Sequence, residues 1–241
     1  MIINRLEQFN VPLKHKSPLV LANCRVFFDF DNTMTRFDVL DEIIKKFSVN
    51  DHWKALQVAW ENGEIGTKEC LEGQLRGIRI TKKALDKFLA GVQLDKSCYK
   101  LLSLLNREGV RPVILSDNFD PIIERILEHH GLKDIKVYAN ALRFYKDHLI
   151  PSFPYDNPFC PSCAHCKKIH LTGGHEDHKL IVYVGDGRSD FCPAKVSDIV
   201  FAKDSLLEHL KQVGKPCVAY KELGTVYNHF KEIVDGPASQ D

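Results

Sequence analysis

The sequence has almost no net charge, and it has no long apolar run. Its 241 residues include 33 Lys and Arg and 32 Asp and Glu, which gives a formal net charge of +1. A basic surface that binds nucleic acid or an anionic membrane needs a clear excess of positive charge. No run of residues approaches the roughly 18 apolar positions that a membrane-spanning helix requires. We therefore expect neither a nucleic-acid partner nor a membrane partner, and a small or neutral partner instead.

The N-terminal segment also lacks the unbroken apolar stretch of a signal peptide, because polar residues interrupt it throughout. We therefore expect a cytoplasmic protein, in which cysteine thiols stay reduced. Cysteine, by contrast, is plentiful, since the chain has eight. Cys160, Cys163 and Cys166 fall in one short segment with His165, and these soft ligands suit a structural Zn²⁺ ion. The alternative is a reduced, metal-free loop whose cysteines only pack.

Four short apolar segments end in polar residues, and each has the composition of a buried strand. Helical patterns lie between the later ones, and Asp120 and Pro121 mark the start of one, as its cap and its first position. This alternation predicts an α/β fold with a Rossmann-like parallel sheet and helices on both faces. Because the carboxyl ends of such strands form the ligand crevice, the polar residues should converge there. The expected strands are 24–31, 110–115, 180–184 and 198–202, and the expected helices are 96–108, 121–130, 205–213 and 225–234.

The stretch 38–94 breaks this alternation, because its pattern is helical throughout and glycines fall between the helical segments. It predicts a small, inserted all-helical cap domain. The remaining segments, 1–37 and 95–241, form the predicted core domain. Within that domain, 143–170 is expected to begin as a hairpin and to continue as the cysteine-rich loop. The expected cap helices are 39–47, 52–60, 67–78 and 82–90.

Two carboxylates, Asp29 and Asp31, come directly at the end of the first expected strand. Like charges this close raise one another's pKa unless a cation lies between them, and carboxylate oxygens are ligands that Mg²⁺ prefers. The second half of such a site follows another expected strand at Asp186, where Gly185 and Gly187 allow a tight turn and leave space for a ligand. The sequence therefore predicts a Mg²⁺ site at the carboxyl ends of these strands.

Four motifs follow one another along the chain. They are Asp-Phe-Asp-Asn-Thr at 29–33, a strand that ends in Ser116, a lysine, and Gly-Asp-Gly-Arg-Ser-Asp at 185–190. In this order they resemble the motifs of phosphatases of the haloacid dehalogenase (HAD) superfamily, subfamily I, and the resemblance extends from Cys24 to Lys203. It implies a Mg²⁺-dependent phosphomonoester hydrolase that acts on a small phosphorylated metabolite through an aspartyl-phosphate intermediate.

Carried over to these positions, the resemblance assigns catalysis to two carboxylates. Asp29 is the implied nucleophile, and Asp31 is the implied general acid and base, which protonates the leaving oxygen and then activates water. Mg²⁺ would be bound by Asp29, by the backbone carbonyl of Asp31 and by Asp186, with Asp190 supporting its outer shell. The implied phosphate-binding residues are Ser116, Asp117, Asn118 and a lysine.

The lysine has three candidates, Lys167, Lys168 and Lys179. In related phosphatases with a cysteine-rich loop, this lysine directly follows the last cysteine, which favours Lys167 here. Lys179 precedes the strand that leads to Asp186 and fits simpler spacing. If zinc binds to the loop, we expect it to hold Lys167 in place without taking part in the chemistry.

Within the superfamily, the chain resembles two groups of phosphatases most. Ser116-Asp117-Asn118 suggests the phosphoethanolamine/phosphocholine phosphatases, and the Cys-x-x-Cys-Lys loop suggests the methionine-salvage 2-hydroxy-3-keto-5-methylthiopentenyl-1-phosphate phosphatase. Phosphoserine phosphatases rank third, because they use a cap arginine for the substrate carboxylate where spacing places Gln74, although Arg76 is close. Asp38 would suit an amine or choline head group. The expected substrate contacts in the cap are therefore Asp38, Gln74 and Arg76.

Two other classes of function remain open. One is a non-catalytic HAD-fold metal-binding or regulatory module whose working part is the cysteine-rich loop. The intact residues Asp29, Asp31, Ser116 and Asp186 argue against it. The other is a phosphotransferase or mutase that passes the phosphoryl group to a sugar, although a simple hydrolase needs fewer parts. The oligomeric state is also open.

Overall fold

The computed structural model describes residues 20–160, 162–173 and 179–235. The contacts divide the chain into two compact units. The first unit comprises Met1–Asp29, Leu94–Val113 and Lys168–Asp241, and the second comprises Phe30–Gln93 and Ile114–Lys167. This division does not test the expected core and cap domains, whose boundaries stay a prediction. None of the helices in the described ranges has the length and apolar character needed to span a bilayer.

The first unit is built on strands that pair in parallel. These are β1 (Cys24–Phe28), β5 (Leu180–Gly185), β6 (Ile199–Ala202) and β7 (Val218–Ala219). β1 pairs with β5, β5 with β6, and β6 with β7. Apolar residues follow one another in β1, β5 and β6 without alternation, and most of them are buried, as expected for strands covered on both faces. The expected strands at 24–31, 180–184 and 198–202 are confirmed, although the first of them ends at Phe28.

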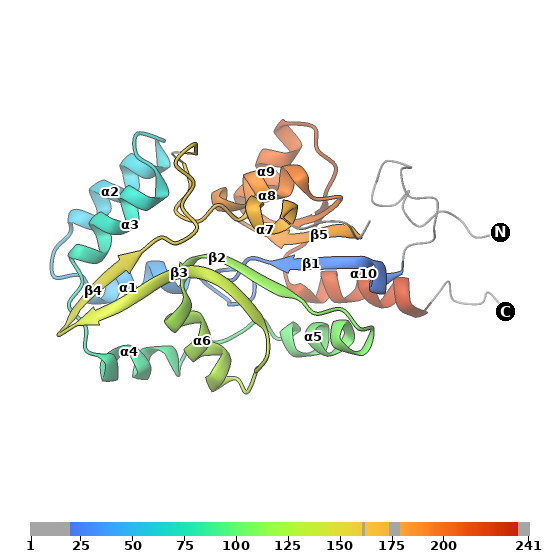
Figure 1. Cartoon of the computed structure of the whole chain (residues 1–241), viewed down its shortest axis with the longest axis horizontal. Coiled ribbons are helices and arrows are strands. Elements are labelled where there is room, and N and C mark those ends of the chain that lie inside the picture. The colour runs from blue at the N-terminus through green and yellow to red at the C-terminus, as the bar shows by residue number, and fades with distance from the viewer. Residues whose placement is uncertain (1–19, 161, 174–178, 236–241) are drawn as a thin grey trace. The chain divides into compact units, whose positions relative to one another are not determined.

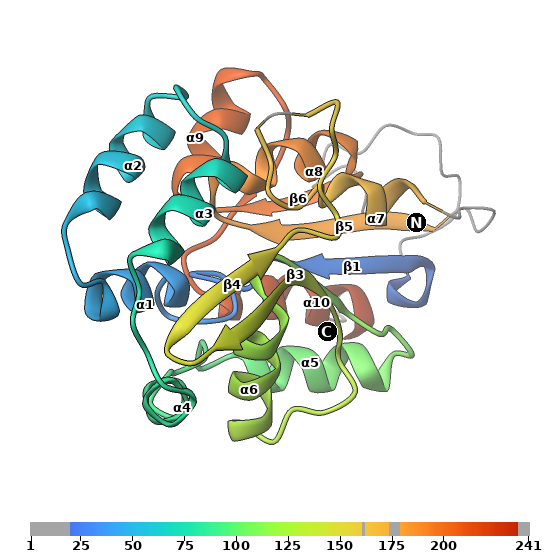
Figure 2. The ribbon, with the colours of Figure 1, turned by 60° about the vertical axis from the view of Figure 1, so that its left-hand side comes forward.

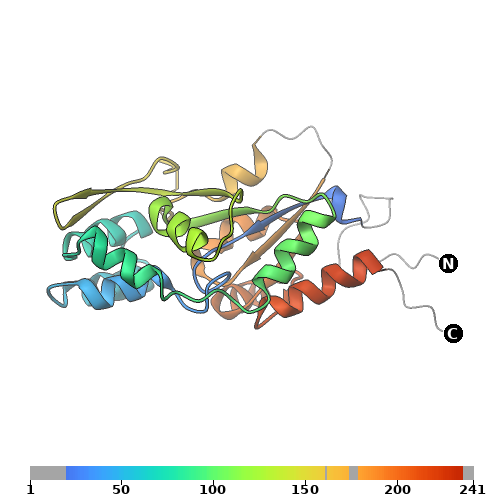
Figure 3. The same ribbon diagram turned by 90° about the horizontal axis from the view of Figure 1, so that it is seen from below.

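Helices cover both sides of these strands. They are η2 (Leu21–Asn23), α5 (Cys98–Arg107), α7 (Lys168–Thr172), η3 (Arg188–Asp190), α8 (Phe191–Val196), α9 (Asp204–Gln212) and α10 (Leu223–Asp235). Figure 2 shows α8 and α9 on one side of β5 and β6, and α5 and α10 on the other side of these strands. In Figure 3, α5 (green) lies beside α10 (red), with which it packs. The expected helices at 96–108, 205–213 and 225–234 are therefore confirmed.

The second unit contains the helical segment that the sequence predicts. Its helices are α1 (Val39–Phe47), α2 (His52–Glu61), α3 (Thr67–Arg76) and α4 (Lys82–Leu89). A polar or small residue precedes each of them at the N-cap: Asp38, Asp51, Gly66 and Thr81. Asp38 caps α1 by accepting from the backbone N–H of Asp41, and Thr81 caps α4 by accepting from that of Ala84. The helical pattern of this stretch is confirmed.

The same unit contains nearly all of β2 (Val113–Phe119), together with α6 (Asp120–His129), β3 (Lys136–Tyr145) and β4 (His148–Ser152). β3 and β4 form an antiparallel hairpin, which is the long pair of yellow arrows in Figure 1. α3 packs against β4, and α4 packs against α6. The hairpin expected from 143 onward is confirmed, and it begins earlier than the sequence indicates.

β2 and α6 meet differently from the prediction. The strand begins at Val113 and continues through Ser116 to Phe119, so Phe119 and not Asp120 is the N-cap of α6. Phe119 is extended, with φ −114° and ψ 137°, and its N–H donates to the side-chain oxygen of Asn118 at 2.7 Å. Asp120 already has a helical conformation, which excludes it from the cap position. Pro121 still lies in the first turn, where its missing N–H costs nothing.

In the first unit, the strands lie side by side in the order β1-β5-β6-β7. The pairs in the first unit are parallel, and the β3–β4 pair is antiparallel. An α/β fold with a mostly parallel, Rossmann-like sheet is therefore confirmed. Non-consecutive strands lie next to one another, so the residues that follow β1 and β5 emerge side by side.

Candidate active site

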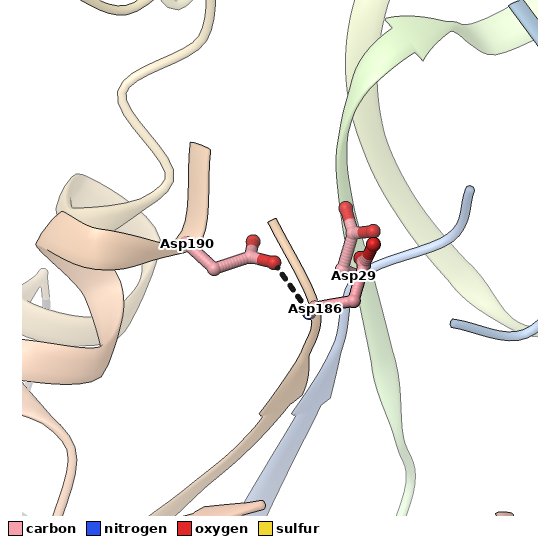
Figure 4. A group of neighbouring side chains, drawn as sticks. All are labelled: Asp29, Asp186 and Asp190. Atoms are coloured by element: carbon pink, nitrogen blue, oxygen red, sulfur yellow. Dashed lines mark hydrogen bonds between the residues drawn. The ribbon is translucent and has the colours of Figure 1, made fainter. Parts of the chain in front are cut away.

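Asp29 and Asp186 follow two neighbouring parallel strands in the first unit. β1 and β5 pair with Phe28 opposite Val184, and the N–H of Asp29 donates to the carbonyl of Val184 at 2.9 Å. The ladder therefore fixes the distance between the two strand ends. In Figure 4, the carboxylates of Asp29 and Asp186 lie close together beyond these ends, and Asp190 approaches from the other side of the Asp186 backbone. Within the described ranges, these three form the one group whose ligand atoms all lie within 4.8 Å of one another.

Asp190 is the anchor of the turn after β5. It is fully buried, with 0% of its surface exposed. One carboxylate oxygen accepts from the Tyr183 hydroxyl at 2.6 Å, and the other accepts from the N–H groups of Asp186 and Gly187 at 2.9 and 3.0 Å. These bonds hold the backbone of Asp186, so its side chain is presented from a fixed position. Local sequence does not reveal this role of Tyr183, because the residue has the pattern of one more apolar strand residue.

Gly185 leaves the space that Asp190 needs. A Cβ atom added at Gly185 would lie 2.4 Å from a carboxylate oxygen of Asp190 and 2.9 Å from the Tyr183 ring. No real Cβ atom makes such contacts, so glycine is required here for close approach. On the far side of the turn, the carbonyl of Asp186 accepts from the N–H of Leu206 at 2.9 Å. The turn is thus held by the start of α9 as well.

The donor set of this group fits a hard divalent cation. Carboxylate oxygens are the ligands that Mg²⁺ prefers, and two carboxylates converging at one point favour a cation between them. Asp29 is buried and Asp186 half-buried, and both direct their oxygens to the same place. The oxygens of Asp190 bind the backbone and Tyr183, and its role in the outer shell of the metal stays a prediction.

Asp31 belongs to a second group of polar side chains, in the second unit. It follows the buried Phe30, and the chain then turns at Asn32, whose φ of 51° lies in the left-handed region that asparagine tolerates. The turn brings the N–H of Val39 to one Asp31 carboxylate oxygen at 2.9 Å. The side-chain amide of Asn118 donates to both oxygens, at 3.1 and 3.0 Å. Asp31 therefore has a fixed orientation.

Ser116 and Asn118 complete this second group. The Ser116 hydroxyl lies 3.4 Å from a carboxylate oxygen of Asp31 and accepts from the N–H of Asn118 at 3.1 Å. Asp117 takes part through its backbone, because its carbonyl accepts from the Asn140 side chain at 2.7 Å. The structure thus brings Asp31, Ser116 and Asn118 together as predicted. Since one residue separates Asp29 from Asp31, chain geometry alone keeps their Cα atoms within about 7 Å.

A family model now places these residues in context. The model of the haloacid dehalogenase-like hydrolases matches residues 26–195. The chain belongs to this family. The predicted family and the predicted hydrolase class are therefore confirmed.

Two curated relatives of this HAD-like hydrolase have different names. It is 24% identical over 229 residues to a 2-hydroxy-3-keto-5-methylthiopentenyl-1-phosphate phosphatase of Bacillus pumilus, with 90% of this chain and 94% of the relative covered. It is 26% identical over 194 residues to the phosphoserine phosphatase of Homo sapiens, with 79% and 86% covered. These identities are similar, so the relatives' names do not rank the two substrates.

Solved structures share the fold of the HAD-like hydrolase. One is a HAD family hydrolase of Salmonella enterica subsp. enterica serovar Typhi, with a TM-score of 0.69 and 15% identity over 89% of this chain and 73% of that chain. Another is a phosphoserine phosphatase in the form of a phospho-aspartyl intermediate analogue, with a TM-score of 0.63 and 18% identity over 85% of this chain and 97% of that chain. At such identities, the likeness shows the fold alone.

The three lysine candidates differ in burial. Lys167 is 1% exposed, which is unusual for a lysine, whereas Lys168 at the start of α7 and Lys179 before β5 are both exposed. A buried ammonium group needs a partner, so burial at this position is consistent with a function. The assignment of Lys167 to phosphate binding stays a prediction.

The structure does not support the predicted zinc site. Across residues 20–160, 162–173 and 179–235, Cys160, Cys163, Cys166 and His165 do not form a group with metal-ligand geometry. Cys160 and Cys163 have their sulfur atoms 3.7 Å apart, but the Cys166 sulfur accepts from the side chain of Asn157 instead. The His165 ring turns into the protein and binds the Ser116 carbonyl at 2.9 Å. The loop is thus closed by hydrogen bonds and packing.

The three expected cap contacts lie in different environments. Asp38 caps α1, and Arg76 is exposed in the last turn of α3. Gln74 is 3% exposed, and its amide donates to the Gln57 side chain at 3.2 Å. Near Asp38, burial raises the pKa of the Asp41 carboxyl, against the opposing effect of a nearby lysine. Whether Asp38, Gln74 and Arg76 contact a substrate stays a prediction.

Proposed function

We propose that this HAD-like hydrolase is a Mg²⁺-dependent phosphatase that cleaves small phosphomonoesters through an aspartyl-phosphate on Asp29. The observation that carries the proposal is the fixed carboxylate of Asp31, two residues after Asp29. Asn118 and the Val39 N–H hold that carboxylate, with the Ser116 hydroxyl 3.4 Å away. A positioned acid and base beside a nucleophile is what hydrolysis of a phosphate ester requires.

The reaction has two displacements at phosphorus. An Asp29 oxygen forms a bond to phosphorus while the bond to the ester oxygen breaks, and Asp31 gives its proton to the leaving alcohol. Asp31 then takes a proton from water, whose oxygen attacks phosphorus. The acyl-phosphate bond breaks, and inorganic phosphate and the Asp29 carboxylate are released. Asp31 thus acts as an acid in its protonated form and then as a base in its ionised form, while the ionised carboxylate of Asp29 is the nucleophile.

Charge neutralisation comes from groups around these carboxylates. A bound Mg²⁺ would supply positive charge that lets an anionic carboxylate approach an anionic phosphate. Asp29, Asp186 and the backbone carbonyl of Asp31 would hold it, with Asp190 fixing the turn that presents Asp186. Ser116, Asn118 and the backbone of Asp117 would donate hydrogen bonds to the phosphate oxygens, and Lys167 would add its charge.

The neutral side chain of Gln74 supports a substrate without a carboxylate. Gln74 is a buried neutral amide, and sequence spacing assigns to it the position of the cap arginine of phosphoserine phosphatases; Arg76 is exposed at the end of α3. A neutral amide can hydrogen-bond to an oxygen atom, but it has no positive charge to offset the cost of burying a carboxylate. We therefore rank an enol phosphate or an amino-alcohol phosphate, with Asp38 near its amine, above phosphoserine. Phosphoserine is the second candidate, because the human phosphoserine phosphatase is 26% identical to this chain.

Turnover of an aryl phosphate tests the mechanism. With Mg²⁺ present, we expect the wild type to release inorganic phosphate and Asp29→Ala to be inactive. The matched control is Asp147→Asn in the exposed turn between β3 and β4, which should keep wild-type turnover. Beryllofluoride, which mimics the aspartyl-phosphate, should bind only when Mg²⁺ is present. Turnover that persists in Asp29→Ala would reject the mechanism.

A substrate panel tests the choice of leaving group. Phosphoethanolamine, phosphocholine, the methylthiopentenyl enol phosphate and phosphoserine would be compared by kcat/KM at equal Mg²⁺. We expect phosphoserine to be the poorest of the four, and Gln74→Arg to raise its relative kcat/KM. A wild type that prefers phosphoserine would reverse the ranking. With a free sugar added as acceptor, phosphoryl transfer to the sugar in place of water would show as formation of a sugar phosphate.

A further inference from the structure

Among the described residues of the cysteine-rich loop (residues 153–160 and 162–167, between β4 and α7), the last four are buried. Ala164, His165, Cys166 and Lys167 are buried in succession, whereas Cys160 and Cys163 are only half-buried. The His165 ring is 1% exposed and stacks on Tyr155, with centroids 4.8 Å apart and an angle of 26° between the planes. The N–H of Cys166 donates to the Tyr155 carbonyl at 2.9 Å. The imidazole therefore has a single orientation.

That orientation directs His165 to the strand that carries Ser116. Nδ1 of His165 lies 2.9 Å from the Ser116 carbonyl oxygen, although 49 residues separate the two in sequence. A carbonyl oxygen can only accept, so Nδ1 is the protonated nitrogen of this ring. The bond is buried, where a lost donor would leave a carbonyl without its partner.

The next carbonyl of β2 is held in the same way. Nδ2 of Asn140, on β3, donates to the Asp117 carbonyl at 2.7 Å, and Asn140 is fully buried. Two successive carbonyls at the end of β2 thus accept from buried side chains. Between them, these bonds fix the backbone that presents the Ser116 hydroxyl and the Asn118 amide to Asp31.

We propose that His165 is a positioning residue for phosphate binding: by donating to the Ser116 carbonyl, it locks Ser116 and Lys167 to each other. The inference rests on the proposed function, since it assumes that Ser116 and Lys167 bind the phosphate together. Lys167 follows His165 by two residues, so an anchored imidazole also anchors the lysine backbone. In this proposal, the cysteine-rich loop positions the phosphate-binding residues without a metal.

Two amide variants separate this role from mere packing. Asparagine places its donor nitrogen where Nδ1 of histidine lies, whereas glutamine places its amide where Nε2 lies. We expect His165→Asn to keep kcat/KM for an aryl phosphate within about fivefold of wild type. His165→Gln should lose about tenfold to a hundredfold, because small displacements of substrate-binding groups are costly. The inhibition constant of inorganic phosphate should rise in parallel. His148→Gln, exposed at the start of β4, is the control and should match wild type.

A double-mutant cycle tests whether His165 acts through Ser116. In the Ser116→Ala background, His165→Gln should cost less than it does in wild type, because part of what it disturbs is already missing. If His165→Gln lowered kcat/KM by the same factor in both backgrounds, the proposal would be overturned. So would a His165→Asn variant as slow as His165→Gln.

Hydrogen exchange separates a failure of this inference from a failure of the proposed function. Amides of residues 116–119 and 164–168 should exchange faster in His165→Gln than in wild type and His165→Asn, whether or not the enzyme turns over. A wild type without phosphatase activity would reject the proposed function, and the exchange rates would then decide the role of His165. If exchange were unchanged in both segments of His165→Gln, the proposed role of His165 would be overturned. It would also be overturned if exchange became faster while the variant stayed active with an unchanged kcat/KM.

Discussion

Two groups of potential metal ligands differ in the structure that positions their side chains. One is the three carboxylates that follow β1 and β5, and the other is the three cysteines of the cysteine-rich loop. Asp29, Asp186 and Asp190 have ligand atoms within 4.8 Å of one another. Asp29 and Asp186 extend from paired strands, and Asp190 is fixed to the turn by three hydrogen bonds. In the loop, the sulfur atoms of Cys160 and Cys163 are 3.7 Å apart, while Cys166 is buried against Asn157.

This difference shows why spacing means more at strand ends than in loops. A parallel ladder fixes which residues lie opposite one another, so two polar residues that follow neighbouring strands must meet. A loop imposes no such register, and each side chain takes the partner that packing offers it. Cysteines close in sequence can therefore serve unrelated purposes.

Removal of Mg²⁺ should have the largest effect on turnover. This effect should depend on the carboxylate site and not on the cysteine-rich loop. With excess chelator, and in Asp186→Asn, we expect turnover of an aryl phosphate to fall about a thousandfold or more, because the attacking carboxylate and the phosphate repel each other. The double variant Cys160→Ser, Cys163→Ser should retain turnover within about twofold. Steady-state kinetics at saturating substrate measure both. If the cysteine variant lost activity and added Zn²⁺ restored it, the cysteine-rich loop would also be a metal site that activity requires.

Loss of the general acid should have the next largest effect. In Asp31→Asn, kcat should fall about a hundredfold to ten-thousandfold for an alkyl phosphate, whose leaving oxygen needs a proton. The fall should be smaller for a nitrophenyl phosphate, whose leaving group departs without one. Asp147→Asn serves as the exposed control. An equal loss with both substrates would mean that Asp31 acts only through the geometry of its neighbours.

Much of the fold follows from the sequence, because its signals are local. The cap helices repeat apolar residues at helical spacing, and β1 and β5 are short apolar runs that end in carboxylates. The short elements α7 and β7 carry too few residues for a pattern and were not predicted. The continuation of β2 through Ser116 was also missed, because Ser-Asp-Asn is typical of a turn. Its extended form depends on donors from His165 and Asn140, which are distant in sequence and leave no local signal.

A substitution at Gly185 should affect stability more than one at Gly187. In Gly185→Ala, the new Cβ would lie 2.4 Å from a carboxylate oxygen of the fully buried Asp190, so we expect unfolding to become easier by about 1–3 kcal/mol. In Gly187→Ala, no heavy atom lies within 4 Å of the new Cβ, and φ is −116°. That variant should stay within about 0.5 kcal/mol of wild type. Urea titrations measure both, and equal losses would mean that Asp190 can move aside.

Thiol labelling should show the smallest effect and should leave turnover untouched at short times. Burial raises the pKa of Cys24 and Cys98 to about 12, so their thiolate fraction at pH 8 is very small. Cys160 and Cys163 are half-buried and should react with iodoacetamide before the buried Cys24 and Cys98, as followed by mass spectrometry of peptides. A chelator should leave their rate unchanged, because hydrogen bonds and packing hold the loop. If Cys160 instead reacted slowly and a chelator made it react faster, a metal would be bound there. The two regions would then differ only in which metal each binds.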